Sequence, residues 1–207
     1  SVILNRKKEN EEQYVDYLLK EIALVGRYLK GRLVKQLHFG GGTPTQLDLA
    51  QLKRIFKALD ETFEIDYGSE IAIEIDPRTV DETKLQSLKE MGFNRVSFGV
   101  QDLDPKVQEA VKRRQTEEMT KETFYLARKL RFKGINVDLI YGLPFQTVQT
   151  FTRTVDEIVK MNPDRIALFS YAKVPWLKPH QKAIRDENLP STEEKFAIYQ
   201  MARKKFQ

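Results

Sequence analysis

The chain contains no cysteine among its 207 residues, and it has only two histidines. Without cysteine there is no disulfide framework, and no thiolate is available as a nucleophile or a metal ligand. The histidines, His38 and His180, do not have the spacing of a metal site. The sequence therefore predicts no catalytic side chain and no metal ligand in this chain, so any difficult chemistry would fall to a cofactor.

Long hydrophobic runs are also missing. No apolar stretch approaches the ~20 residues that a membrane-spanning helix needs, and residues 5–12 are too polar for a signal peptide. The net charge of +5 comes from mixed charges without an Arg/Lys stripe interleaved with aromatics, which argues against nucleic-acid binding. We expect a cytoplasmic protein with no membrane or nucleic-acid partner.

Short apolar runs alternate with longer amphipathic patterns, which is typical of a parallel sheet with helical crossovers. The sequence predicts strands at Leu33–Phe39, Glu70–Asp76, Arg95–Gln101, Asn136–Tyr141 and Arg165–Tyr171. It predicts helices near Asn10–Lys30, Gln46–Phe63, Val80–Met91, Pro105–Arg114, Lys121–Arg131 and Thr147–Met161, and a closing helix capped by Ser191 or Thr192. Both an open sheet and a barrel fit this order.

The strands have one apolar face and one small or polar face. In residues 71–76 isoleucines alternate with Ala72, Glu74 and Asp76, and Asp138 faces away from its aliphatic neighbours. Strands covered by helices on both sides would be apolar on both faces. The pattern favours a curved α/β sheet or barrel that has helices outside and a ligand cavity inside, near the C-terminal strand ends.

The first predicted strand ends in Gly40-Gly41-Gly42-Thr43-Pro44. Glycines allow a ligand to approach the backbone closely, although a tight turn is an equally good interpretation of three glycines alone. Glu74 could accept a hydrogen bond from a ligand ammonium or hydroxyl, or satisfy nearby backbone. Gln101 and Asp138 are expected at strand ends and suit a ribose diol. Taken alone, Arg113 in a charged run favours a solvated side chain, and His38 favours a satisfied core histidine.

The glycine segment resembles the motif with which radical S-adenosylmethionine enzymes hold the methionine end of their cofactor. Further strings resemble the oxygen-independent coproporphyrinogen III oxidase family: residues 73–78, 98–102, 136–144, 162–165 and 169–172, with Val174, Pro175 and Gln181. The likeness runs in order along nearly the whole chain. It implies a partial parallel (β/α) barrel, formed by residues 1–207 as one core domain that is truncated at both ends.

The resemblance implies a reaction in haem biosynthesis that removes two propionate carboxyls from coproporphyrinogen III and gives protoporphyrinogen IX. In this family a reduced 4Fe–4S cluster cleaves S-adenosylmethionine, and the resulting radical abstracts a propionate hydrogen. Two S-adenosylmethionine molecules are implied, together with a tetracarboxylate tetrapyrrole substrate, an electron-donor protein and a monomer. By position, Gly41 and Glu74 match contacts to the first molecule. Gly42, Thr43, Gln101, Arg113, Asp138 and Ala172 match contacts to the second.

One departure from the family is large. Its cluster is held by a three-cysteine loop that follows the first barrel strand, and this chain has no cysteine and five predicted strands instead of six. We interpret the chain as one that starts after the cluster loop, near the segment resembling residues 1–6. The alternatives are a haem chaperone of the same family and a cluster-free α/β-barrel enzyme. Glu74-Ile75-Asp76-Pro77-Arg78 favours the oxidase over the chaperone, which reads Glu-Ala-Asn-Pro there.

Overall fold

The structure is a computed structural model that describes residues 8–29 and 31–207, except for the side chain of His180. Expectations that concern residues 1–6 and Lys30 lie outside the described residues. The strands are β1 (Leu33–Phe39), β2 (Glu64–Ile75), β3 (Arg95–Gln101), β4 (Gly134–Tyr141) and β5 (Arg165–Ser170). The helices are α1 (Lys8–Leu29), α2 (Leu49–Thr62), α3 (Glu82–Glu90), α4 (Pro105–Ala110), α5 (Glu117–Lys129), α6 (Val148–Met161) and α7 (Thr192–Phe206). Short 3₁₀ turns include η1 (Pro44–Gln46) and η2 (Pro77–Thr79).

The strands of the described residues are hydrogen-bonded in chain order, β1-β2-β3-β4-β5, and the pairs β1–β2 and β4–β5 are parallel. The chain divides into two compact units. The first contains residues 1–97 and 126–133, and the second contains residues 98–125 and 134–207.

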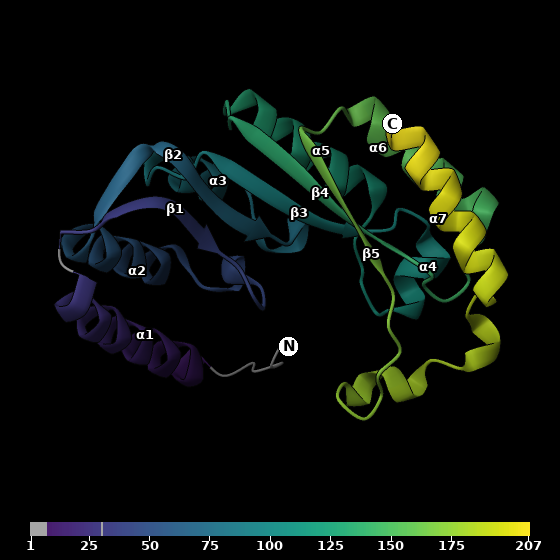
Figure 1. The fold of residues 1–207 in the computed structure, drawn as a ribbon, viewed down its shortest axis with the longest axis horizontal. Helices are drawn as coiled ribbons and strands as arrows, with labels where there is room; N and C mark the ends of the chain where they lie inside the picture. The colour runs from purple at the N-terminus through teal and green to yellow at the C-terminus, as the bar shows by residue number, and fades with distance from the viewer. Residues whose placement is uncertain (1–7, 30) are drawn as a thin grey trace. The chain divides into compact units, whose positions relative to one another are not determined.

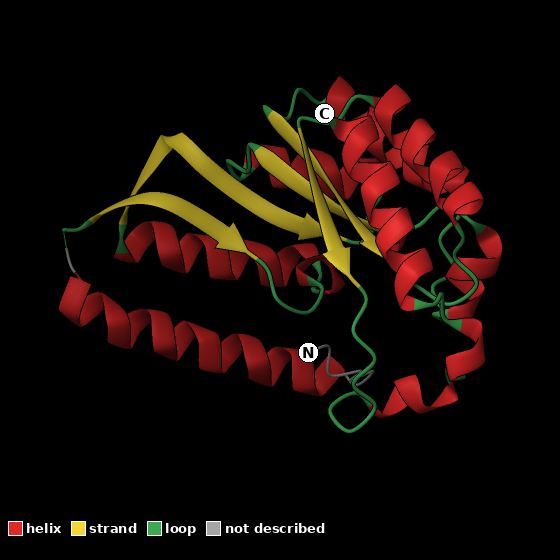
Figure 2. Cartoon of the chain, turned by 45° about the vertical axis from the view of Figure 1, so that its right-hand side comes forward, coloured by secondary structure: helices red, strands yellow, loops and turns green. Residues whose placement is uncertain are grey.

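In the first unit, α2 lies beside β1 and β2, and α1 lies on the outer side of α2 (Figures 1 and 2). Val15, Ile22 and Ile55 form the buried centre of the α1–α2 contact. Arg54 of α2 also reaches Glu12 and Asp16 of α1 at 2.6 and 2.8 Å. Asp48 caps α2 in a reciprocal capping box with Gln51, which fixes where this helix begins.

In the second unit, α7 packs against α6 (Figure 1). The α6 helix buries Phe151, Val155 and Ile158, which recur at the helical period. Strand β4 alternates as predicted, because Val137 and Leu139 are fully buried while Asp138 between them is not. Phe98 and Val100 of β3 are buried in the same alternating way.

Most predicted boundaries are accurate to within two residues, and four differ by more. Strand β2 begins at Glu64 instead of Glu70, since Leu33 already pairs with Glu64 before a register shift in β1. The helix predicted at Gln46–Phe63 is the turn η1 followed by α2. Helix α4 ends at Ala110 instead of Arg114, and Lys112 adopts a left-handed φ of 55°. Helix α5 begins at Glu117 instead of Lys121, with acidic residues in its first turn that suit the helix dipole.

The predicted cap of α7 is confirmed: the Ser191 side chain accepts a hydrogen bond from the backbone nitrogen of Glu194 at 3.1 Å. We expect Ser191→Ala to lower the free energy of unfolding by about 1 kcal/mol, because it leaves an unsatisfied donor in the first turn. Ser191→Asp should retain the stability. Urea unfolding followed by circular dichroism measures both. Equal midpoints for the alanine variant and the wild type would contradict a stabilising cap.

Candidate functional site

The glycine segment follows directly after β1 and precedes η1 in the first unit. Gly41 has a φ of 106°, a conformation that favours glycine. A Cβ atom built on Gly41 or on Gly42 would meet no atom within 4 Å, so the backbone beside these residues is open to a ligand. The next residue, Thr43, does not use its side chain to cap the turn. The segment therefore presents exposed backbone that a small polar molecule could reach.

The end of this segment is fixed to the end of β2. The fully buried Thr45 places its hydroxyl 2.6 Å from that of Thr79, and Lys84 donates to the carbonyls of Thr45 and Leu47 at 2.6 and 2.8 Å. Burial lowers the pKa of Lys84. Asp76 caps η2 and accepts a bidentate pair from Arg78 at 2.9 and 2.6 Å. These contacts connect the residues that follow the glycines to the turn after β2 and to α3.

Glu74 of β2 lies beside the glycine segment, as an alanine Cβ at position 40 would sit 2.9 Å from Glu74 Oε1. The Glu74 carboxylate is partly exposed, with 38% of the side chain accessible, and His38 Nε2 lies 3.3 Å from its Oε1. The expectation that His38 is a core histidine was wrong, since 48% of its side chain is exposed.

Gln101 and Asp138 belong to the second unit. Gln101 is the last residue of β3 and adopts a left-handed φ of 68°, which sequence reasoning did not foresee. Asp138 lies inside β4, opposite Ala167 of β5, and not at the strand end where it was expected. Both side chains are partly exposed. Their partial exposure leaves them accessible to a ligand, and a ligand role stays a prediction.

Arg113 and Ala172 also lie in the second unit. Arg113 follows α4, donates from Nη2 to the carbonyl of Gly99 at 2.5 Å and from Nε to Gln115 at 2.8 Å. The guanidinium is therefore held against β3 and is not freely solvated. Ala172 follows β5, and its carbonyl accepts from Gln181 at 3.1 Å. Because the other predicted residues, Gly41, Gly42, Thr43 and Glu74, belong to the first unit, a common cavity for all of them remains a prediction.

A buried polar network after β3 was missed by sequence reasoning. Asp102 is fully buried and accepts from Thr154 Oγ1 at 2.5 Å, from Gln146 Nε2 at 2.6 Å and from the backbone of Asp104 at 2.9 Å. Gln146 in turn accepts from the backbone of Gly142 after β4 at 2.6 Å. Burial raises the pKa of Asp102, and these donors partly oppose the shift. The network fixes the chain directly after Gln101.

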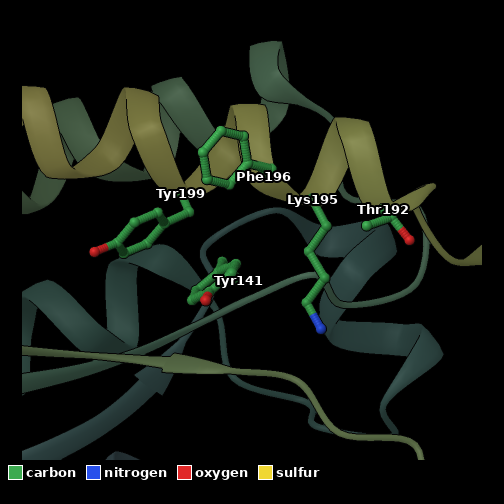
Figure 3. Close-up of a pocket in the computed structure, with 5 residues that line it drawn as sticks. All are labelled: Tyr141, Thr192, Lys195, Phe196 and Tyr199. Carbon is green, nitrogen blue, oxygen red and sulfur yellow. The ribbon is translucent and has the colours of Figure 1, made fainter.

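A small pocket of about 190 Å³ lies between α7 and the end of β4 in the second unit. Figure 3 shows Phe196, Tyr199 and Lys195 coming from α7, opposite Tyr141, with Thr192 at the first turn. The Lys195 amine donates to the carbonyl of Tyr171 at 2.6 Å and lies 5.8 Å from the centre of the Tyr141 ring. None of the predicted site residues lines this pocket.

The described residues contain no cluster of three or more His, Cys, Asp or Glu residues that could hold a metal ion. No helix in the described ranges is long and apolar enough to cross a membrane.

Several relatives are similar to this chain over almost its whole length. Proteins named oxygen-independent coproporphyrinogen III oxidase from Synechocystis and Escherichia coli are each 43% identical over 97% and 96% of the chain, and a Helicobacter pylori protein of that name is 44% identical over 96%. The chain spans only 43%, 43% and 44% of these proteins.

Solved structures agree with the sequence relatives. The structure of coproporphyrinogen III oxidase from Escherichia coli, described as a radical SAM enzyme, matches with a TM-score of 0.92 and 43% identity over 96% of this chain and 46% of that one. An archaeal Elp3 from Methanocaldococcus infernus matches with a TM-score of 0.64 at 18% identity, over 81% and 44% of the two chains, and shows the fold alone. The predicted fold class, an α/β partial parallel barrel, is thereby confirmed. The family description "Radical SAM superfamily" matches residues 5–158, so the chain belongs to the radical SAM superfamily.

Proposed function

We propose that the complete protein containing this chain is an oxygen-independent coproporphyrinogen III oxidase. One observation carries the proposal: identity of 43% to proteins of that name extends over 96% or more of the chain, with a TM-score of 0.92 to a solved enzyme. The reaction would remove two propionate carboxyls from coproporphyrinogen III and leave vinyl groups. A tetracarboxylate substrate also suits the net charge of +5.

The first unit carries features that suit the amino-acid end of S-adenosylmethionine. Open backbone at Gly41 and Gly42 can hydrogen-bond a carboxylate, and Glu74 beside Gly40 can accept from an ammonium group. We propose that Gly41 and Glu74 hold the first molecule of this cofactor. When bound, the cofactor supplies the radical that removes a hydrogen from the substrate.

A second S-adenosylmethionine is proposed at Gly42, Thr43, Gln101, Arg113, Asp138 and Ala172. The resemblance supports this assignment, and the fixed guanidinium of Arg113 is compatible with binding a carboxylate. These residues would bind and orient the molecule and keep water away from it.

The residues of this chain do not fit a 4Fe–4S cluster, because such clusters are held by thiolates and the chain has no cysteine. We therefore expect this 207-residue chain to incorporate no cluster and to show no turnover. Anaerobic reconstitution with iron and sulfide, followed by iron analysis and visible absorption, measures this. Stoichiometric incorporation of a cluster into the chain would contradict the expectation.

The remaining assignments concern the whole protein. We propose a monomer that works in the cytoplasm with a tetrapyrrole substrate and an electron-donor protein, and that needs no membrane or nucleic acid. The absence of a membrane-spanning helix among the described residues is compatible with this setting.

The test uses the complete protein, purified without oxygen and loaded with its cluster. With coproporphyrinogen III, S-adenosylmethionine and a reductant, chromatography should detect protoporphyrinogen IX after oxidation to the fluorescent porphyrin, and omission of S-adenosylmethionine should abolish it. Tight haem binding without decarboxylation would support the haem chaperone instead. A complete protein that binds neither S-adenosylmethionine nor a cluster would favour the cluster-free barrel enzyme.

A further inference from the structure

His38, Gly40 and Glu74 form a close group within the first unit. The register of the parallel pair places His38 of β1 opposite Ala72 of β2, and Glu74 is the next residue on the same face of β2. Because Ala72 is small, the imidazole can extend past it, and His38 Nε2 lies 3.3 Å from Glu74 Oε1. An ionised carboxylate only accepts hydrogen bonds, so Nε2 carries the proton in this contact.

Gly40 is the residue that leaves space for this contact. An alanine Cβ at position 40 would lie 2.5 Å from His38 Nε2 and 2.9 Å from Glu74 Oε1. Both distances are shorter than the contacts that real Cβ atoms make, so both side chains would have to move. The missing side chain of Gly40 therefore allows the imidazole and the carboxylate to meet against the glycine segment.

We propose that His38 is a positioning residue for Glu74. Its Nε2–H holds one carboxylate oxygen beside Gly40, and the remaining lone pairs stay available for the α-ammonium group of S-adenosylmethionine. This inference rests on the proposed function. It differs from the assignments above because His38 acts through Glu74 and does not itself contact the cofactor.

The pair is partly exposed, so it contributes little to folding. Its effect should instead appear on binding, since a free glutamate side chain would have to be immobilised when the ammonium binds. That cost corresponds to about threefold to tenfold in affinity. A merely structural histidine would change the stability and leave the affinity for the cofactor unchanged.

Equilibrium dialysis measures the affinity of the complete, cluster-loaded protein for S-adenosylmethionine. We expect His38→Leu to weaken binding about threefold to tenfold. His38→Gln should bind like the wild type because its amide nitrogen reaches about as far as Nε2, whereas the shorter His38→Asn should behave like the leucine variant. Gln36→Leu is the matched control, because Gln36 lies on the same face of β1 and donates to Glu70 at 3.2 Å.

Two further measurements separate positioning from general disturbance. An analogue that lacks the α-ammonium group should bind the wild type and His38→Leu equally. Combining His38→Leu with Glu74→Gln should add no loss beyond that of Glu74→Gln, as expected of residues that act together. Equal affinity of His38→Leu and the wild type for S-adenosylmethionine, or full additivity in the double variant, would overturn the inference. Failure of the wild type to bind S-adenosylmethionine would overturn the proposed function, and this inference with it.

Discussion

Replacing Asp102 with alanine is expected to lower the free energy of unfolding by about 2–4 kcal/mol. The substitution removes the acceptor for the Thr154 hydroxyl and the Gln146 amide, which donate to it at 2.5 and 2.6 Å. Each buried donor left without a partner costs about 1–3 kcal/mol. Removing a buried charge offsets part of this loss.

The loss can be divided between the partners of Asp102. Thr154→Val removes one donor with little change in shape and should cost about 1 kcal/mol. Asp186→Asn serves as the control, because the Asp186 side chain is 89% exposed and surface changes usually stay within about 0.5 kcal/mol. Urea unfolding followed by circular dichroism measures all three variants. A change for Asp102→Ala as small as that of the control would contradict a structural role for the network.

The same carboxyl group predicts a dependence of stability on pH. Burial raises the pKa of Asp102 in the folded protein above its ordinary value of about 3.9. The contribution of Asp102 to the free energy of unfolding is therefore largest below its pKa in the unfolded chain. This contribution declines as the pH rises through its pKa in the folded protein. The free energy of unfolding of the wild type, relative to that of Asp102→Asn, should be highest at acidic pH. This difference should become constant once the pH is above the pKa of Asp102 in the folded protein. A difference that instead grows with rising pH would show that the hydrogen bonds outweigh burial.

Replacing Glu74 with glutamine is expected to weaken binding of S-adenosylmethionine to the complete protein about tenfold to hundredfold. The change keeps the shape of the side chain and removes the charge that would pair with an ammonium group, an interaction of about 1.5–3 kcal/mol. Because 38% of the Glu74 side chain is exposed, solvent screening favours the lower part of this range. Isothermal titration calorimetry of the cluster-loaded protein gives both affinities.

Glu70→Gln is the matched control for this measurement. Glu70 lies on the same face of β2 and contacts Gln36 and Arg95, at 3.2 and 2.8 Å. Its substitution should affect stability and leave cofactor affinity unchanged. If Glu74→Gln binds S-adenosylmethionine as tightly as the wild type, Glu74 is structural and the assignment of the first cofactor site is wrong.

The sequence predicted the alternation of strands and helices because each strand carries a period of two and each amphipathic helix a period near 3.6. The resemblance assigned Gly41 and Glu74 to the same cofactor molecule, and so implied that Glu74 would lie near the glycine segment. The sequence did not predict that His38 reaches Glu74, since this contact depends on the register of β1 against β2 and on the small size of Ala72. The Asp102 network was missed because its partner Thr154 lies 52 positions away.

The left-handed backbone of Gln101 restricts which amino acids can replace it, independently of any ligand. Glycine enters this conformation freely and asparagine is several-fold enriched in it, whereas valine and isoleucine are strained there. Replacing Gln101 with every other amino acid would therefore separate the requirement for folding from the requirement for ligand binding. Variants that fold well should be rich in glycine and asparagine, and those that also bind ligand should be confined to side chains that restore the amide. Directed evolution toward other substrates would have few accessible steps at this residue, even though it lies at the end of an otherwise regular strand.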